Sequence, residues 1–260
     1  MRVIVTRPQR EAERWVHQLR QCGLDALALP LMAIAPAPDV QPLHEAWRRL
    51  GNFAALMFVS GNAVEHFFEQ KVPEAHTGWS RPAIKTRAWA AGPATREALV
   101  CAGVDPGLID APASDAAQFD SEALWQQVAG QVVPGGRVLI VRGGDRTGQS
   151  AGRDWLSGQL VAAGVQVETV LAYVRRAPVF GAEQLAQAQQ AATDGSVWLF
   201  SNSEAIANLV RLLPGQSWTE ARAMATHPRI AQAARRAGFG VVCESRPDLD
   251  AVVAALESIR

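Results

Sequence analysis

The stretch "VWLFSNSEAIANL", Val197 to Leu209, shows the pattern on which the expected fold is built. Apolar residues of strand character end at Ser201-Asn202-Ser203, and a helical pattern with one apolar face begins at once. A second stretch, "LMFVSGNAVEHFF" from Leu56 to Phe68, is built in the same way. Each stretch predicts a strand, a tight turn and a helix that starts directly after the turn.

Apolar runs alternate with amphipathic stretches along much of the chain. Within the runs, apolar and polar residues do not alternate, which is typical of parallel strands buried on both faces. The runs and the helical stretches after them are Val3–Val5 with Ala12–Leu19, Leu56–Val59 with Ala63–Phe68, Val138–Val141 with Trp155–Ala162, and Val197–Phe200 with Ala205–Leu212. The pattern predicts the α/β class, with parallel sheets covered by helices.

Several segments occur twice. The similar pairs are "FVSGNAV" from Phe58 with "FSNSEAI" from Phe200, "AGPATREALVCAG" from Ala91 with "THPRIAQAARRAG" from Thr226, and "RVIVTR" from Arg2 with "RVLIVR" from Arg137. We therefore expect two similar α/β domains of flavodoxin-like or Rossmann-like type. Because the repeated pieces do not follow one another as a simple tandem, we expect the second domain to be inserted into the first.

The insertion predicts domain boundaries. The first domain would comprise residues 1–35 and 174–260, and the second residues 40–170. The chain would cross between them at "IAPAPDVQP" (Ile34–Pro42) and "VLAYVRRAP" (Val170–Pro178), and both segments can run extended. Residues 36–39 and 171–173 form the expected linker.

Composition narrows the function classes. Basic and acidic residues balance at 25 each, so the overall charge indicates no nucleic-acid or membrane-surface partner. No apolar run approaches the ~18 to 20 residues of a membrane span. Cys22, Cys101 and Cys243 lack CxxC spacing, which favours a reduced, cytoplasmic compartment, and the histidines lack metal-ligand spacing. Any charged ligand must therefore be bound by a local site.

Candidate binding residues lie at the carboxyl ends of the expected strands. Small hydroxyl and amide residues there cap the following helix and leave its first N–H groups within reach of an anion. The residues at these turns are Thr6 and Arg7; Ser60, Gly61 and Asn62; Gly92 and Thr95; Ser201, Asn202 and Ser203; and His227. A single such turn is read either as plain N-capping or as an anion site, whereas several in two similar domains favour binding.

Two further features stand at the later strand ends. A glycine-rich segment, "VRGGDRTGQSAGRDWL" from Val141, lacks the spacing of a phosphate-binding P-loop. Tyr173 is the only tyrosine and falls in the second crossing. Its phenol is either a structural anchor or a group that reaches a bound ligand.

These motifs together resemble the uroporphyrinogen-III synthase family over nearly the whole chain. The segments that carry the resemblance are "VTRP" at Val5, "FVSGNAV" at Phe58, "AAGPATREAL" at Ala90, "DSEAL" at Asp120, "VLIVRGG" at Val138, "AYVRRAP" at Ala172, "FSNSEAIANL" at Phe200 and "THPRIAQAARRAG" at Thr226. The family often has Thr-Ser where this chain has Val59-Ser60 and Ser201-Asn202. One hydroxyl is thus missing at the first turn, and an amide replaces another at the second.

The resemblance implies a specific architecture and activity. It implies two α/β domains, one inserted in the other, with a two-stranded linker and an active site in the cleft between them. The implied enzyme is a cytoplasmic, monomeric hydro-lyase of tetrapyrrole (haem) biosynthesis. It would cyclise hydroxymethylbilane to uroporphyrinogen III with inversion of ring D and loss of water, using no metal and no organic cofactor.

The resemblance also implies roles for individual residues. Tyr173 matches a linker tyrosine that assists departure of the substrate hydroxyl group. The implied substrate-binding residues are Thr6, Arg7, Ser60, Gly61, Asn62, Gly92, Thr95, Arg142, Ser201, Asn202, Ser203, His227 and Arg229. Two alternatives stay open, because Arg7 can be structural and Arg229 can pair on the surface of its helix. A different class of function also stays open, namely a non-catalytic binding or regulatory module for a carboxylated small molecule.

Overall fold

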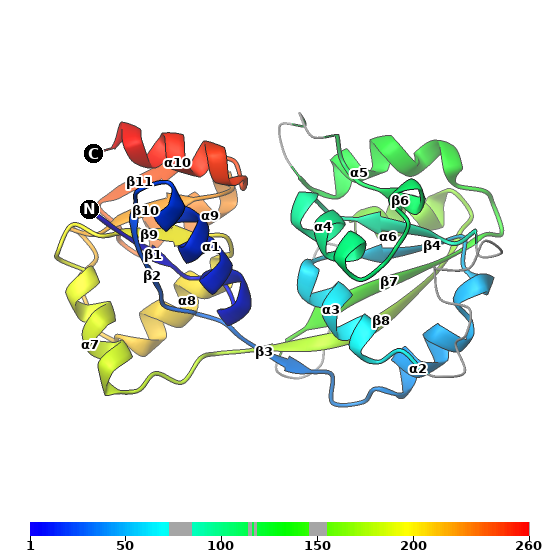
Figure 1. Ribbon diagram of the computed structural model, residues 1–260, viewed down its shortest axis with the longest axis horizontal. Helices are drawn as coiled ribbons and strands as arrows, with labels where there is room; N and C mark the ends of the chain where they lie inside the picture. Colours follow the sequence, from blue (N-terminus) through cyan, green and yellow to red (C-terminus); the bar gives the residue numbers. More distant parts are fainter. Residues whose placement is uncertain (73–84, 114–115, 117–118, 146–154, 260) are drawn as a thin grey trace. The chain divides into compact units, whose positions relative to one another are not determined.

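The computed structural model describes residues 1–72, 85–113, 116, 119–145 and 155–259 (Figure 1). The chain divides into two compact units, which we call unit 1 (Met1–Ala33 with Arg176–Arg260) and unit 2 (Ile34–Arg175). Each unit is built on its own mainly parallel sheet with helices, so the predicted α/β class with two parallel-sheet units is confirmed. Residues 36–39 and 171–173, the expected linker, lie in unit 2.

Unit 1 contains a sheet with the strand order β11-β10-β9-β1-β2, in which each neighbouring pair runs parallel. Its strands are β1 (Arg2–Val5), β2 (Asp25–Ala28), β9 (Val197–Phe200), β10 (Arg222–Ala225) and β11 (Val241–Glu244). Its helices are α1 (Gln9–Gln21), α7 (Ala182–Ala191), α8 (Ser203–Leu212), α9 (Pro228–Arg236) and α10 (Leu249–Ser258). The neighbouring strands β1 and β9 come from the two separate segments of unit 1.

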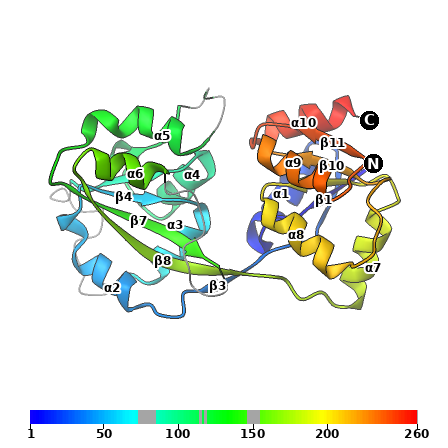
Figure 2. The ribbon, with the colours of Figure 1, turned by 180° about the vertical axis from the view of Figure 1, so that it is seen from behind.

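Alternate residues of the unit 1 strands pack against different helices, because successive side chains of a strand point to opposite faces. Val3 and Val5 belong to a core cluster with residues of α1 and α10. Ile4 belongs to another, with residues of α7, α8 and α9. Figure 1 looks onto the α1 side of this sheet, and Figure 2 shows α8 and α9 from behind. The sheet is therefore buried on both faces, as its unbroken apolar runs predict.

Unit 2 contains a sheet with the strand order β3-β8-β7-β4-β5-β6, in which the pairs from β8 to β6 run parallel. The strands are β3 (Ala33–Pro36), β4 (Ala55–Phe58), β5 (Arg87–Ala90), β6 (Ile109–Asp110), β7 (Arg137–Gly144) and β8 (Gln166–Arg176). The helices are α2 (Gln41–Arg48), α3 (Gly61–Glu69), α4 (Pro93–Cys101), α5 (Ser121–Val128) and α6 (Trp155–Ala162). Single 3₁₀ turns lie at Leu50–Asn52, Pro106–Leu108 and Ala129–Gln131.

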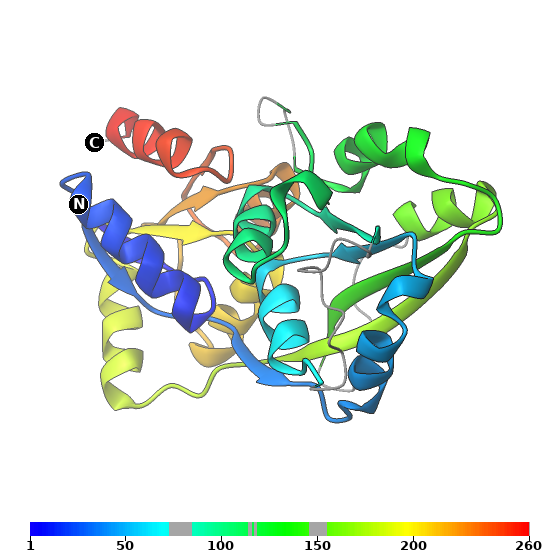
Figure 3. The same cartoon turned by 45° about the vertical axis from the view of Figure 1, so that its right-hand side comes forward.

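Unit 2 also buries both faces of its sheet. Leu56 and Phe58 of β4 pack in a cluster with residues of α2, α3 and α4. Ala55 and Met57 pack in another with residues of α5 and α6. Figure 3 shows α3 (cyan) and α4 (teal) side by side over one face. This packing holds the carboxyl end of β4 against the start of α3.

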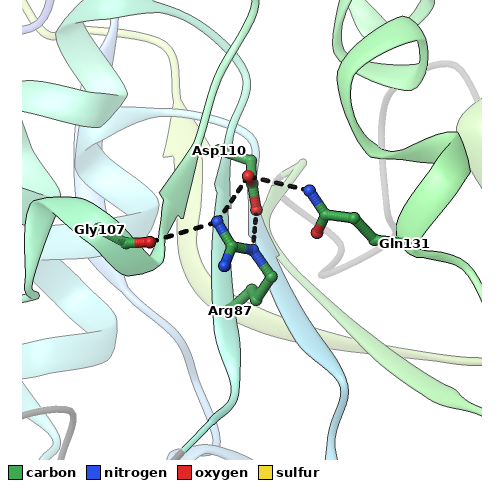
Figure 4. A network of polar contacts seen from close by, with 4 residues as sticks. All are labelled: Arg87, Gly107, Asp110 and Gln131. Atoms are coloured by element: carbon green, nitrogen blue, oxygen red, sulfur yellow. Dashed lines mark hydrogen bonds and ion pairs between the residues drawn. The ribbon is translucent and has the colours of Figure 1, made fainter.

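The edge strand β6 is held by a polar network (Figure 4). The Arg87 guanidinium pairs with both carboxylate oxygens of Asp110 and donates from Nη2 to the Gly107 carbonyl at 3.4 Å. Gln131 Nε2 donates to Asp110 Oδ1 at 3.0 Å. The hydrogen bond to Asp110 raises the pKa of Arg87, although burial opposes it. A strand of two residues is thus fixed by side chains as well as by its ladder.

Within the described ranges, no helix combines the length and apolar character that crossing a membrane requires.

Candidate functional site

Four strands lead directly into helices through turns of the same length. Two residues separate β4 from α3, β5 from α4, β9 from α8 and β10 from α9. In a parallel sheet the carboxyl ends of the strands share an edge, so within each unit the helix N-termini gather at that edge. The predicted strand–turn–helix pairs are confirmed, and of the candidate residues Ser60, Gly92, Ser201, Asn202 and His227 lie in these turns.

Tyr173 lies in β8 of unit 2, beside β7, with only 5% of its surface exposed. It belongs to the core cluster that contains Phe58 and Phe67. Its hydroxyl is 3.1 Å from the Ser60 Oγ atom, and either atom can be the donor. The phenol is therefore an anchored side chain whose polar end lies at the start of α3.

Ser60 joins this phenol to a helix N-terminus. Its backbone is extended, with φ −165° and ψ 165°, and its Oγ accepts a hydrogen bond from the Ala63 N–H at 3.2 Å. Ser60 is thus the N-cap of α3 as well as the partner of Tyr173. The N-cap interpretation is confirmed for this residue, and its role in binding stays a prediction that capping does not exclude, since one hydroxyl can accept twice and donate once.

Two neighbours of Tyr173 were not predicted. The His66 ring of α3 lies with its centroid 5.9 Å from that of Tyr173, and His66 Nδ1 is 3.0 Å from a Glu69 carboxylate oxygen. Gly143 of β7 is paired in register with Tyr173. For Gly143 the sequence held one signal, the Gly-Gly pair that ends a strand-like run, whereas nothing local singles out His66.

The other predicted residues of unit 2 occupy nearby elements. Gly61 and Asn62 begin α3, and Gly92 is the N-cap of α4 with an extended backbone. Thr95 is buried in the first turn of α4. Arg142 is buried in β7 and is adjacent in sequence to Gly143. Most of the glycine-rich segment that follows, residues 146–154, lies outside the described residues.

In unit 1 the N-termini of α8 and α9 are capped by side chains from the preceding turns. Asn202 Oδ1 accepts a hydrogen bond from the Glu204 N–H at 2.7 Å, and His227 Nδ1 accepts one from the Arg229 N–H at 3.1 Å. Ser201 is half-buried, and Ser203 is exposed as the first residue of α8. The geometry accounts for Asn202 and His227 as caps, and their role in binding stays a prediction.

Thr6 and Arg7 make contacts within unit 1. Thr6 Oγ1 donates to the Leu199 carbonyl at 2.7 Å and so links the end of β1 to β9. The Arg7 guanidinium lies 4.4 Å from the Trp15 ring centroid, and its Nη1 is 3.3 Å from Glu11 Oε2. Burial lowers the pKa of Arg7, which Glu11 partly offsets. These contacts are structural, and a binding role for either residue stays a prediction.

A shallow groove in unit 1 lies apart from most of these turns. It has a volume of about 420 Å³ and runs between α8 and α9. Its lining residues are Ser203, Ile206, Ala207, Val210, Arg211, Ala233, Arg236 and Ala237. Only Ser203 belongs to the predicted set, because the groove follows the helices and not the strand ends. Across the described residues, no group of three or more His, Cys, Asp or Glu side chains is placed to hold a metal ion.

Comparison with known proteins gives a consistent result. The family model described as uroporphyrinogen-III synthase HemD matches residues 13–254. A uroporphyrinogen-III synthase of Synechococcus elongatus is 28% identical over 176 residues, which are 68% of this chain and 61% of that protein. A uroporphyrinogen-III synthase of Chlorobaculum parvum is 31% identical over 118 residues, 42% of this chain and 44% of that protein. The matched segments thus span less than two thirds of either relative.

Solved structures share the fold over the full chain. The crystal structure of the Helicobacter pylori uroporphyrinogen-III synthetase aligns over 100% of both chains with a TM-score of 0.61 and 17% identity. A mutant uroporphyrinogen III synthase of Thermus thermophilus aligns over 100% of this chain and 97% of its own, with a TM-score of 0.55 and 18% identity. At these identities the likeness concerns the fold. Because the family model matches nearly the whole sequence, the chain belongs to the uroporphyrinogen-III synthase HemD family.

Proposed function

We propose that this protein is a uroporphyrinogen-III synthase of tetrapyrrole biosynthesis. It would act as a hydro-lyase that cyclises hydroxymethylbilane to uroporphyrinogen III, inverting ring D and releasing water. The match of the family model over residues 13–254 supports the activity. The observation that carries the mechanism is the position of the Tyr173 hydroxyl, 3.1 Å from the Ser60 Oγ that caps α3. As the resemblance implies, the enzyme would work in the cytoplasm as a monomer.

The reaction begins with cleavage of the C–O bond of the hydroxymethyl group. The electron pair stays on oxygen, which leaves as hydroxide, and a hydrogen bond from the Tyr173 hydroxyl stabilises the charge that develops there. The azafulvene-like cation that remains is attacked by the substituted carbon of ring D, giving a spiro intermediate. The bond between ring D and its original methylene bridge then breaks, and the free α carbon of ring D bonds to that methylene, which leaves ring D inverted. The proton lost from this carbon restores the aromatic pyrrole and converts the departed hydroxide to water. Atoms balance as one substrate giving one macrocycle and one water.

The enzyme's main task in this scheme is to select a geometry. A free azafulvene-like cation would be expected to close without inversion, so the protein must favour the transition state that leads to the spiro intermediate. The substrate carries acetate and propionate groups on its rings, and helix N-termini are suited to binding carboxylates. We propose that the turns before α3, α4, α8 and α9, with Arg142 and Arg229, bind these groups.

The deciding experiment is an isomer assay. Purified protein is incubated with freshly prepared hydroxymethylbilane, the products are oxidised to porphyrins, and the type I and type III isomers are separated. We expect the type III isomer to predominate with protein and the type I isomer without it. Type I product alone would refute the synthase activity and would favour the alternative, a module that binds a carboxylated small molecule without chemistry.

A further inference from the structure

We infer that Gly143 is a positioning residue for Tyr173, because only a residue without a side chain lets the phenol lie against β7 with its hydroxyl at Ser60. The inference rests on the proposed function where it concerns turnover. Its first part, the placement of the ring, can be tested independently of activity.

The strand register brings the two residues together. β7 and β8 run parallel, and Gly143 is the register partner of Tyr173. The register shifts between Arg142 and Gly143, so that Arg142 pairs with Leu171 and the residue between Leu171 and Tyr173 has no partner of its own. Such irregularities re-aim side chains near functional sites. Here the shift sets Gly143 opposite the only tyrosine of the chain.

The space at Gly143 is filled by the tyrosine ring. A Cβ atom placed on Gly143 would lie 2.3 Å from Tyr173 Cζ, 2.5 Å from Cε2 and 2.8 Å from the hydroxyl oxygen. Real Cβ atoms do not approach other heavy atoms this closely. A planar ring cannot bend away as the end of a long side chain can, so any side chain at position 143 must displace the ring as a whole.

Displacement of the ring would break its polar contact. Tyr173 is packed in the unit 2 core beside His66, which leaves the ring little room to shift and keep its hydroxyl in place. That hydroxyl lies 3.1 Å from Ser60 Oγ, which is already long for a hydrogen bond between two hydroxyl groups. A movement of even part of an ångström away from Ser60 would lose the bond.

The contact with Ser60 matters for the direction in which Tyr173 donates. Ser60 Oγ already accepts the Ala63 N–H at the start of α3. If the Ser60 O–H donates to the phenol oxygen, the Tyr173 O–H is left to donate to the departing hydroxyl group of the substrate. Successive donors in such a chain polarise one another, and this chain begins at the positive end of a helix. Gly143 would hold the last donor of the chain in line.

The test compares Gly143→Ala with Gly158→Ala. Gly158 lies in α6, and a Cβ atom added there would meet nothing within 4 Å, so it controls for the change of residue type. Each protein is prepared with tyrosine labelled with carbon-13 at Cζ, which gives one resonance because the chain has one tyrosine. We expect Gly143→Ala to move this resonance in the same direction as Ser60→Ala does, and Gly158→Ala to leave it in place.

The same variants are assayed for type III product. We expect Gly143→Ala to lower kcat by about 100-fold, with KM close to that of the unchanged protein. In the Tyr173→Phe background, Gly143→Ala should lower kcat far less than it does in the unchanged protein, because the two changes act on one hydroxyl.

An unmoved resonance overturns the inference, whatever happens to kcat. A moved resonance with unchanged kcat overturns the link to turnover. If the unchanged protein makes no type III product, the proposed function fails while the resonance still tests the placement.

If Gly143→Ala does not fold, the double variant Gly143→Ala/Tyr173→Leu decides. Leucine lacks the outer ring atoms that would meet the new Cβ. We expect it to restore cooperative unfolding and the native far-ultraviolet circular dichroism. A double variant that stays unfolded would show that the glycine is needed for another reason and would overturn the inference.

Discussion

At the level of single residues, Tyr173 has an observed structural role and a proposed catalytic one. It is packed in the core of unit 2, and its hydroxyl is held at the N-cap of α3. Burial fixes the ring, and a fixed ring presents its donor in one direction without further loss of side-chain entropy. The structural and the functional interpretations of this lone tyrosine are therefore compatible.

The substitution Tyr173→Phe tests the proposed catalytic role of this residue. The ring stays in its pocket, but the donor is gone, so we expect kcat for type III product to fall by about 10- to 100-fold while KM stays nearly unchanged. Loss of the bond to Ser60 should also lower the free energy of unfolding by about 1 kcal/mol. Initial rates over a range of substrate concentrations measure the first effect, and urea unfolding measures the second. Unchanged kcat would remove Tyr173 from the mechanism and leave the family assignment intact.

Substitutions at Asn202 test whether its side chain stabilises the N-terminus of α8. Asn202→Ala removes the acceptor of the Glu204 N–H, and we expect it to lower the free energy of unfolding by about 1 kcal/mol. Asn202→Ser and Asn202→Asp supply another acceptor and should restore most of that stability. Urea unfolding of the three variants makes the comparison. An Ala variant as stable as the unchanged protein would contradict a capping role.

Asn202 also bears on how carboxylates are bound. If backbone N–H groups hold them, Asn202→Ser should leave KM for hydroxymethylbilane nearly unchanged, because the helix N-terminus is preserved. Asn202→Asp places a negative charge at the same point, and we expect it to raise KM several-fold. Equal KM values for the Ser and Asp variants would argue against substrate carboxylates near this turn.

At the scale of elements, a charge cluster joins the start of β7 to β8. Glu168 of β8 pairs with the guanidinium of Arg137 and with Arg49 Nη2 at 3.1 Å. Both guanidinium carbons lie 5.6 Å from the ring centroid of Phe53. Burial alone would raise the pKa of Glu168, but the hydrogen bonds from Arg137 and Arg49 outweigh burial and lower it.

The direction of this shift predicts a pH dependence of stability. A carboxylate with a lowered pKa in the folded state contributes stability that is fully present above its unfolded pKa, and the contribution is lost as the pH falls through the folded value. Glu168→Gln should therefore lower the free energy of unfolding at neutral pH, by about 0.5 to 1 kcal/mol because the pair is partly exposed. Below about pH 4 the difference from the unchanged protein should shrink.

The measurement is urea unfolding of both proteins at neutral and acidic pH. Glu257→Gln, at an exposed position on α10, is the control and should show no such convergence. A stability difference that stays constant with pH would contradict the charge pairing as its source.

Local patterns in the sequence predict the strand–turn–helix pairs well. Apolar runs and N-cap residues such as Ser60 and Asn202 act within a few positions, so they can be read without knowing the rest of the chain. The strands β2 and β6 are not evident, since β2 (Asp25–Ala28) has only one large apolar residue and β6 has only two residues. The placement of Tyr173 against Gly143 depends on the register of β8 on β7, which is a non-local property that no local pattern specifies.

At the scale of the whole molecule, unit 2 is a continuous segment with its own core. Its two hydrophobic clusters cover opposite faces of one sheet and are formed by residues between Leu43 and Tyr173. We expect residues 34–175, expressed alone, to fold. The measurement is thermal unfolding followed by circular dichroism, where one cooperative transition is the expected result. A gradual loss of signal would contradict independent folding.

Unit 1 differs because its sheet joins distant parts of the chain. Strand β1 pairs with β9, and Val3 is opposite Val197. On a ribosome, the N-terminal strands emerge long before the partner that must complete their sheet, so the inserted unit is the part that can fold first. Its strands β3 and β8 are neighbours at one sheet edge, so a folded unit 2 would hold the two chain crossings together. Without a folded unit 2, the two segments of unit 1 would be joined by a long flexible loop. With unit 2 folded, the effective loop between them is short, and this lowers the entropic cost of assembling unit 1 during translation.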